Sequence, residues 1–535
     1  MRKILAFIVS AVFLFTMTAC GDEPSDGRNY SFSYALSENP QNLDPQLAAD
    51  SNSLTIIENM FEGLTATDEN GAVAYGAAQS CEISEDNLTY TFTLRDDCFW
   101  NDGVNEPYAV TADDFVFAFQ RIFNPVMQSP YRETFLCIKN ASKIINNQLE
   151  YTELGVYAPD DLTVVFELDY RNPCFMELLS TSPAMPCSQK FFESTNARYG
   201  LDDKSVISNG SFYIKQWFYD PYGSDNFILM KRNSANSSEK HDIVPNSINF
   251  TIEKADADIN ESFRTGNYDC IISGSKSDYD NILSRSFTVN EFAYKTLGII
   301  MNCESEQLSD ENIRKALTYS LDRNSYKDKL ISSYQAAYGI VPPCMMTGDS
   351  YYRKIIDDSM LSVYDKQKAL EHINKSENIP NLTLMTTAEY ADTVYMNELA
   401  ASWLDNLGIY VRVEEVELSE YKRRIAEKDY QLAVYEITAN YNNPYDILNI
   451  FRSGNNNFGY SSSDTDNLLE KSTVLNGTEK RCQAYYEAER NIIENCGFIP
   501  VYYKKIYCIY GSGSQDIIFD PFKNTVNFRY GKNFS

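Results

Sequence analysis

Apolar residues recur along the chain in short patches whose spacing predicts strands and helices in alternation. Residues 30–36 alternate apolar and polar side chains, as a half-buried strand does. Residues 53–64 (SLTIIENMFEGL) place apolar side chains at helical spacing between a serine cap and a glycine stop. Residues 90–94 alternate after a polar turn, which predicts an antiparallel hairpin, and residues 111–114 (TADD) predict the capped start of a helix.

The stretch from residue 431 to 446 (QLAVYEITANYNNPYD) combines a short strand pattern with a polar, aromatic loop. Residues that favour strands fill its first half, and asparagines, a tyrosine and a proline fill its second. Ligands of open α/β sheets lie beyond the carboxyl ends of the strands, so this loop is a candidate ligand wall. An ordinary surface turn explains the same pattern and stands as the alternative.

Length and charge narrow the architecture and the partners. A chain of 535 residues exceeds a single hydrophobic core and predicts at least two lobes. The 75 acidic residues outnumber the 46 basic ones and give a net charge of −29. Nucleic acid is therefore not an expected partner, because its phosphates need a basic footprint. The acidic surface serves solubility and also favours cationic ligands.

The N-terminus predicts export and a lipid anchor. Two basic residues precede an apolar run over residues 4–17, which is too short to span a bilayer. The run ends in MTACG, where Cys20 fits the cysteine of a bacterial lipobox and would carry the lipid; an ordinary cleavage site is the alternative. We expect a signal peptide over residues 1–19 and a polar tether over residues 20–29, holding the protein on the extracytoplasmic face of the bacterial cell membrane.

Residue patterns of enzymes and metal sites are absent from the sequence. The two histidines stand in polar segments, and the chain contains no HExxH, GxSxG, GxGxxG or P-loop pattern and no CxxC. We expect no catalysis, no metal site and no cofactor. Two cysteine pairs, Cys81 with Cys98 and Cys174 with Cys187, are candidates for disulfides, with buried free thiols as the alternative.

Seven segments, taken together, resemble one known family. In chain order they read LDPQLAAD with NMFEGL, EDNLTYTFTLRDDCFWNDG with VTADDFVFAFQRIFNP and QSPY, SNGSFYIKQW, SDENIRKALTYSLDR, LAASWLDNLGIYVRVEEV, GYSSSDTDNLLE and FIPVYYKKIY. They follow the order found in the extracellular solute-binding proteins of family 5, the oligopeptide- and dipeptide-binding components of ABC importers. The resemblance runs from about residue 30 to residue 508.

The resemblance implies a two-lobed α/β fold of the periplasmic-binding-protein type, type II and cluster C, with an extra inserted subdomain. Two strand-like crossings, near residues 295–302 and 501–507, would form the hinge between the lobes. The expected division is lobe I over residues 30–69, 190–294 and 506–535, the inserted subdomain over 70–189, and lobe II over 295–505.

It also implies a function. The protein would capture a solute between its lobes as a monomer, close, and deliver the solute to a membrane permease with its ATPase. An oligopeptide is the favoured ligand, and the 39 tyrosines offer flat, amphipathic contact surface for one. The alternatives are an oligosaccharide or another small solute in the same fold, or a surface sensor or adhesion module without transport.

Positions matched to the family's ligand contacts are partly changed in this chain. In peptide-binding members the peptide amine meets an aspartate in an A-D-Y loop, which here reads A-N-Y with Asn440 at the aspartate position. An amide accepts a hydrogen bond from an ammonium group but carries no charge. Ile425 and Val434 fall where some peptide binders place arginines for the ligand carboxylate, and Leu418 falls at the position of a tryptophan.

One carboxylate could replace the missing aspartate. Side chains at period two share a face of a strand, so Glu436 and Thr438 point the same way as Asn440. We hypothesise that Glu436 is a displaced anchor for a ligand cation, with a salt bridge to Arg423 or Arg424 as the alternative. The ligand-binding residues expected in all are Ala49, Asp50, Ser51, Asn52, Tyr131, Glu436, Thr438, Asn440 and Tyr441.

Overall fold

The computed structural model describes residues 30–534 apart from a set of short gaps. Its gaps are residues 69–70, 237–242, 255–256, 275–286, 324–332, 358–360, 362–363, 392, 455, 457, 476 and 512. The expected signal peptide, the tether and Cys20 lie outside the described residues. No helix in the described part of the chain is long and apolar enough to cross a membrane.

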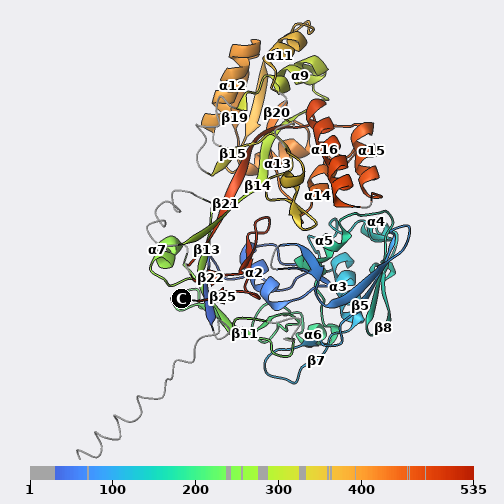
Figure 1. The fold of residues 1–535 in the computed structure, drawn as a ribbon, viewed down its shortest axis with the longest axis vertical. Helices are drawn as coiled ribbons and strands as arrows, with labels where there is room; N and C mark the ends of the chain where they lie inside the picture. Colours follow the sequence, from blue (N-terminus) through green and yellow to red (C-terminus); the bar gives the residue numbers. More distant parts are fainter. Residues whose placement is uncertain are drawn as a thin grey trace, which may run out of the picture.

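Two large sheets organise these residues (Figure 1). The smaller has the strand order β1 (Ser31–Leu36), β12 (Ser247–Ile252), β11 (Phe227–Arg232), β10 (Phe212–Phe218). The larger has the order β13 (Cys270–Ser273), β21 (Ile499–Tyr510), β14 (Thr288–Met301), β20 (Leu432–Ile437), β18 (Leu382–Thr386), β19 (Val411–Glu415), with β15 (Tyr334–Ala336) beside β21. Both mix parallel and antiparallel pairs, since β1 with β12 and β18 with β19 and β20 are parallel. The α/β class predicted from the sequence is confirmed.

A third, antiparallel sheet has the order β4 (Ala78–Ile83), β5 (Thr89–Leu94), β9 (Thr163–Glu167), β8 (Val156–Asp160). Strands β4 and β5 form the predicted hairpin, with Ile83 opposite Tyr90. Five strand pairs are short: β2 (Thr65–Thr67) with β3 (Val73–Tyr75), β6 (Phe99–Trp100) with β7 (Tyr108–Ala109), β16 (Met346–Thr347) with β17 (Ser350–Tyr351), β22 (Ser514–Gln515) with β25 (Lys532–Asn533), and β23 (Ile518–Asp520) with β24 (Thr525–Asn527).

The helices cover these sheets. They are α2 (Ser51–Met60), α3 (Ala112–Phe123), α4 (Ala141–Ile145), α5 (Phe175–Leu179), α6 (Gln189–Ser194), α7 (Ile259–Arg264), α9 (Glu311–Tyr319), α10 (Tyr352–Ile355), α11 (Lys366–Ile373), α12 (Thr393–Leu407), α13 (Leu418–Ala426), α14 (Pro444–Asn449), α15 (Ser463–Ser472) and α16 (Thr478–Glu494). Thr111 and Asp114 form the capping box predicted for α3. The serine cap predicted at Ser53 is wrong, because the Asp50 side chain accepts from the Ser53 backbone N–H and α2 begins earlier.

The hydrophobic core is divided between two lobes, which Figure 1 shows one below the other. In lobe I, the lower body, Phe32, Trp100 and Phe119 belong to one continuous buried cluster. In lobe II, successive residues of β14 and β20 contribute to two different clusters, one around Trp403 and one around Tyr485. Because neighbouring residues of a strand point to opposite faces, the lobe II sheet is buried on both faces.

Two long strands, β14 and β21, pass from lobe I into lobe II, and they run in register from Thr288 opposite Tyr510 to Ile299 opposite Ile499, with two breaks. One break falls between residues 293 and 295 and the other between residues 297 and 298. At the second, a Cβ added to Gly298 would lie 2.3 Å from the ring of Phe498, so only glycine fits there. The expected hinge crossings fall on these strands, and the exact lobe boundaries stay a prediction.

The eleven described cysteines are all free thiols, and nine of them are buried. The candidate pairs Cys81 with Cys98 and Cys174 with Cys187 therefore form no disulfide in this structure. Burial raises the pKa of most of these thiols, that of Cys98 to about 11. Since the thiolate is the reactive form, the buried cysteines are packing residues.

Candidate functional site

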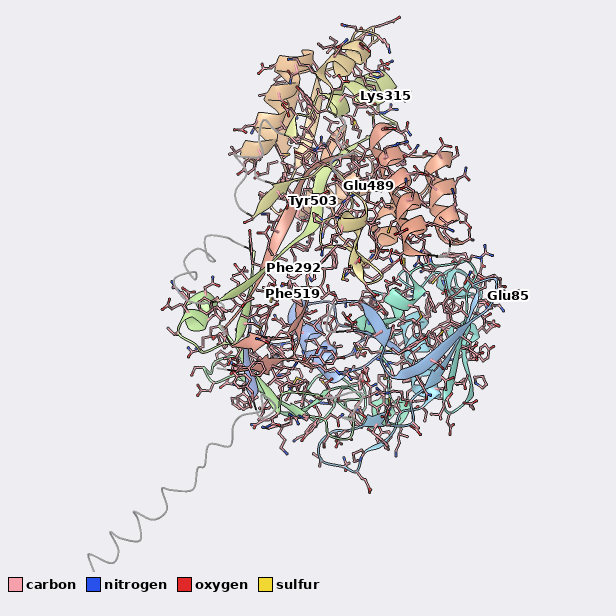
Figure 2. All side chains as sticks on the ribbon, in the orientation of Figure 1. Glu85, Phe292, Lys315, Glu489, Tyr503 and Phe519 are labelled. Carbon is pink, nitrogen blue, oxygen red and sulfur yellow. The ribbon has the colours of Figure 1, made fainter. Side chains whose placement is uncertain are left out.

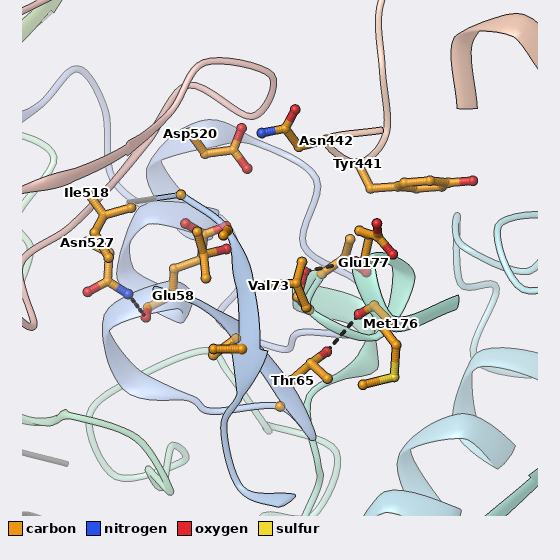
Figure 3. A pocket seen from close by; sticks show the side chains of 18 of the residues that line it. Glu58, Thr65, Val73, Met176, Glu177, Tyr441, Asn442, Ile518, Asp520 and Asn527 are labelled. Atoms are coloured by element: carbon orange, nitrogen blue, oxygen red, sulfur yellow. Dashed lines mark hydrogen bonds between the residues drawn. The ribbon is translucent and has the colours of Figure 1, made fainter. Parts of the chain in front are cut away.

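A pocket of about 490 Å³ lies between the two lobes (Figure 3). Its lobe I wall consists of the end of α2, the hairpin β2–β3, α5 and the hairpin β23–β24. Its lobe II wall consists of the turn between β16 and β17, the loop after β20, and the start of α16. The volume lies within the range of sites for small ligands, about 300–1,000 Å³. Segments distant in the sequence thus meet around one cavity.

The loop after β20 supplies the lobe II wall with Tyr441 and Asn442, and Figure 3 shows the side chain of Asn442 directed towards Asp520 and that of Tyr441 above Glu177. The side-chain oxygen of Asn442 accepts a hydrogen bond from the backbone N–H of Met346 at 2.8 Å, which fixes the loop to the neighbouring hairpin. The predicted strand and the loop that follows it are both present, and the loop lines the pocket.

Asn443 joins this loop to lobe I. Its side-chain oxygen accepts from the backbone N–H of Tyr445 at 3.0 Å and so caps α14, while its side-chain nitrogen donates to Glu177 Oε1 at 2.9 Å. Burial raises the pKa of the Glu177 carboxyl, and this hydrogen bond and the charge of Arg481 act in the opposite direction. A carboxylate with a desolvated, only partly satisfied charge therefore stands where the two lobes meet.

Of the nine ligand-binding residues expected from the sequence, Tyr441 alone lines the described pocket. The segment Ala49, Asp50, Ser51 and Asn52 holds the start of α2 instead: Asn52 Nδ2 donates to Ser37 Oγ at 3.1 Å. The Tyr131 hydroxyl donates to the backbone oxygen of Ala48 beside it. The expected residues of lobe I, residues 49–52 and Tyr131, therefore lie together around the start of α2, apart from the loop after β20.

Asn440, which stands at the position of the family aspartate, is hydrogen-bonded to Asp446 in the first turn of α14. The backbone N–H of Asn440 donates to Asp446 Oδ2 at 2.6 Å, and its side-chain nitrogen lies 3.3 Å from Asp446 Oδ1. Burial raises the pKa of Asp446 to about 6, against hydrogen bonds from Asn440 and the backbone of Tyr441 that favour the charged form. Thr438 is exposed beside this loop. The carboxylate nearest to Asn440 therefore belongs to the chain itself.

Glu436 is held by lysines on the flanking strands. Lys295 Nζ donates to Glu436 Oε1 at 2.7 Å, and Lys504 Nζ lies 3.9 Å from Glu436 Oε2. The alternative from the sequence, a salt bridge to a neighbouring residue of the lobe, is therefore present, but with these lysines in place of the suggested Arg423 or Arg424. Both are occupied by acids closer along the chain, Arg423 by Glu420 and Glu427 one helical turn away and Arg424 by Glu414 and Asp429.

Sequence reasoning missed most of the charged residues around the pocket. Lys523 on the C-terminal hairpin bridges Glu58 at 3.0 Å and Asp520 at 3.1 Å, and Glu62 pairs with both Arg95 and Arg529. Asp520 and Lys523 lie on the same hairpin, but Glu58 and Glu62, near the end of α2, and Arg95 come from segments distant from it, so no local pattern marks the group. Only a tertiary contact reveals that they share one cavity.

Comparison with known proteins places the chain among binding proteins. The sequence pattern of bacterial extracellular solute-binding proteins, family 5 (middle region), matches residues 72–459. The oligopeptide-binding protein OppA of Bacillus subtilis is 27% identical over 525 residues, 93% of each chain, and the periplasmic OppA of Haemophilus influenzae is 26% identical over 86% of each. A probable deoxycholate-binding periplasmic protein of Escherichia coli is 23% identical over 94% of this chain and 93% of its own.

Solved structures share the fold. The murein tripeptide-binding protein MppA, in its unliganded open form, superposes with a TM-score of 0.77 at 22% identity, covering 94% of this chain and 97% of its own. The pheromone receptor PrgZ, solved with its mode of peptide binding, gives a TM-score of 0.67 at 25% identity over 95% of this chain and all of its own. The two-lobed architecture expected from the sequence is confirmed.

Removing the charge of Glu436 tests whether it binds ligand or supports the hinge strands. We expect Glu436→Gln to lower the free energy of unfolding by about 1–3 kcal/mol, because it leaves two partly buried lysines without their carboxylate. Urea denaturation measures this change, and calorimetry with a bound ligand should show affinity within about twofold of wild type. Glu427→Gln, which breaks an exposed pair, is the matched control. A large loss of affinity without loss of stability would restore Glu436 as the cation anchor.

The raised pKa of Asp446 predicts a pH-dependent stability. Its pKa in the folded protein, about 6, exceeds the ordinary value of 3.8, so the folded protein binds the proton more tightly than the unfolded chain does. The stabilisation that follows is fully present below about pH 4 and is lost as the pH rises through 6. We expect the unfolding free energy of wild type minus that of Asp446→Asn to fall between about pH 4 and about pH 7. Urea denaturation across this range checks the slope. A difference that is flat, or that grows with pH, contradicts the assignment.

Proposed function

The chain belongs to the family 5 bacterial extracellular solute-binding proteins, and we propose that it captures an oligopeptide between its two lobes and delivers it to the permease of an ABC importer. One observation carries the proposal: a cavity of about 490 Å³ whose walls come from both lobes. A ligand in such a cavity contacts both lobes at once, so its binding energy favours the closed arrangement. The permease would then recognise the closed, ligand-bound form and not the open, empty form.

The pocket suits a peptide main chain. The hairpins β2–β3 and β23–β24, both lining it, are two-stranded, so each of their strands has one edge that no other described strand covers. An extended peptide presents backbone donors and acceptors that match such an edge, and its side chains alternate between the two walls. Tyr75 and Tyr441 add aromatic surface for those side chains.

A non-peptide solute is the second candidate, and specific positions favour it. Ile425 and Val434, matched to the arginines of some peptide binders, are buried in the lobe II core, and Asn440 carries no charge. The similarity to a probable deoxycholate-binding protein agrees with a family that binds more than peptides. The proposal in either form is binding without catalysis, since the family is made up of solute-binding proteins.

The ligand that accompanies the purified protein decides between these candidates. We expect gentle purification followed by acid release and mass spectrometry to yield short peptides in near-stoichiometric amount, because closed lobes retain ligand. The same treatment of an unrelated exported protein from the same cells is the control. A glycan, a bile-acid-like compound or a metal chelate in place of peptide would contradict the first choice and support the second.

We also propose that lipid on Cys20 anchors the protein outside the cell. The lipobox-like MTACG sequence supports this, together with a polar tether long enough to separate the body from the membrane. We expect wild type to partition into a detergent phase and Cys20→Ala to stay in the aqueous phase. Cys81→Ala, which alters a partly exposed thiol of the folded body, should behave as wild type. A mature N-terminus without lipid mass contradicts the anchor.

A further inference from the structure

Arg481 is a cation of the pocket that has no hydrogen-bond or ion-pair partner among the described side chains. It lies on the lobe II wall, at the start of α16. Its guanidinium makes no hydrogen bond or ion pair within the described part of the chain. Glu489, further along the same helix and labelled in Figure 2, is fully buried. None of the Arg481 nitrogens is among the fully buried atoms without a partner, so the guanidinium stays accessible to solvent and to a ligand.

The other cations of the pocket are already neutralised. Lys523 is bound by Glu58 and Asp520, at 3.0 and 3.1 Å. Arg529 is bound by the buried carboxylate of Glu62. Because their charges are used within lobe I, these two residues have little left to offer a ligand anion. Arg481 is the one cation lining this described pocket whose donors are all available.

The helix gives no folding reason for a cation at this position. Arg481 is the fourth residue of α16, which starts at Thr478 and runs for 17 residues. The first turn of a helix is its positive end, where acidic side chains stabilise and basic ones oppose the helix dipole. Glu479 follows that rule, whereas Lys480 and Arg481 both break it, and of these two only Arg481 lines the pocket. A residue that costs stability and touches a cavity is a candidate for binding.

The carboxylate that faces Arg481 does not neutralise it. Glu177 lines the lobe I side of the same pocket and accepts from Asn443 Nδ2 at 2.9 Å. Arg481 lowers the pKa of Glu177 through its charge, yet no ion pair within 4.0 Å joins the two. A cation without an ion pair and a buried acid therefore stand on opposite walls, and the exposed carboxylate of Asp349, which also has no ion pair among the described residues, lies on the lobe II wall. A ligand with both a negative and a positive end complements that arrangement.

We propose that Arg481 binds the C-terminal carboxylate of a peptide ligand, with the guanidinium donating two parallel hydrogen bonds to the two carboxylate oxygens. The proposal rests on the peptide-binding function and names one of its specificity determinants. A guanidinium matches a carboxylate in geometry and carries a charge at any physiological pH, so it discriminates an acid from an amide. The role suits a chain in which Ile425 and Val434 are core residues.

The test compares two synthetic pools of random-sequence tetrapeptides that differ only at the C-terminus, one with free carboxylates and one with carboxamides. Ligand-stripped protein is mixed with each pool, and retained peptide is quantified after ultrafiltration. We expect wild type to prefer the acid pool by roughly ten- to a hundredfold, as hydrogen bonds to charged groups imply. Arg481→Gln should lose that preference while binding the amide pool as before, and Arg481→Lys should retain part of it.

Lys480→Gln is the matched control, because Lys480 is an exposed cation beside Arg481 on the same helix and does not line the pocket. It should keep the preference of wild type. We expect ligand-free Arg481→Gln to unfold at the temperature of wild type or slightly above it, since no ion pair is lost and a basic side chain leaves the positive end of the helix; this result shows that the variant folds. Equal binding of both pools by wild type, or a preference that survives in Arg481→Gln, overturns the role of Arg481 alone. Binding of neither pool overturns the peptide-binding function, and this inference falls with it.

Discussion

The pairing of β14 with β21 is the constraint on which the two-lobed arrangement depends. Both strands belong to lobe I at one end, where β21 pairs with β13, and to lobe II at the other, where β14 pairs with β20. Leu297, Ile299 and Tyr503 on these strands are completely buried. A shared, hydrogen-bonded ribbon allows bending at its register breaks but resists sliding or free rotation of the lobes. Motion is thereby limited to opening and closing of the pocket.

The charges along this ribbon extend the same constraint to the ligand wall. Glu436 lies on β20 and its partner Lys295 lies on β14, with Lys504 close by on β21, so one carboxylate joins three neighbouring strands. The loop after β20 starts only a few residues further on and is fixed by Asp446 and by the bond from Met346 to Asn442. The wall is thus rigidly attached to the hinge strands. Bending of the ribbon moves the wall as one body toward lobe I.

Local patterns predicted the elements better than the site. Three predicted features depend on residues within a few positions of one another: the hairpin of β4 and β5, the capping box at Thr111, and strand β20. All three are present. Alternation predicted that Glu436 shares a face with Thr438 and Asn440, but it could not supply the partner Lys295, which lies 141 positions earlier. The role of that carboxylate depends on the lysines of the neighbouring strands more than on the face of β20 from which it projects.

The pocket shows the same limit in its electrostatics. Glu177 and Arg481 both stand on helices, where charged side chains are usually solvated, and nothing in their neighbours along the sequence distinguishes them. Their significance comes from what surrounds them: Glu58, Lys523 and Asp520 neutralise one another, and Glu62 is held between two arginines. A wall of paired charges contributes little net field, so the charges left without ion-pair partners among the described residues, those of Glu177, Asp349 and Arg481, dominate the potential felt by a ligand. Specificity in this cavity therefore depends on which charges the fold leaves unpaired, more than on how many charges line it.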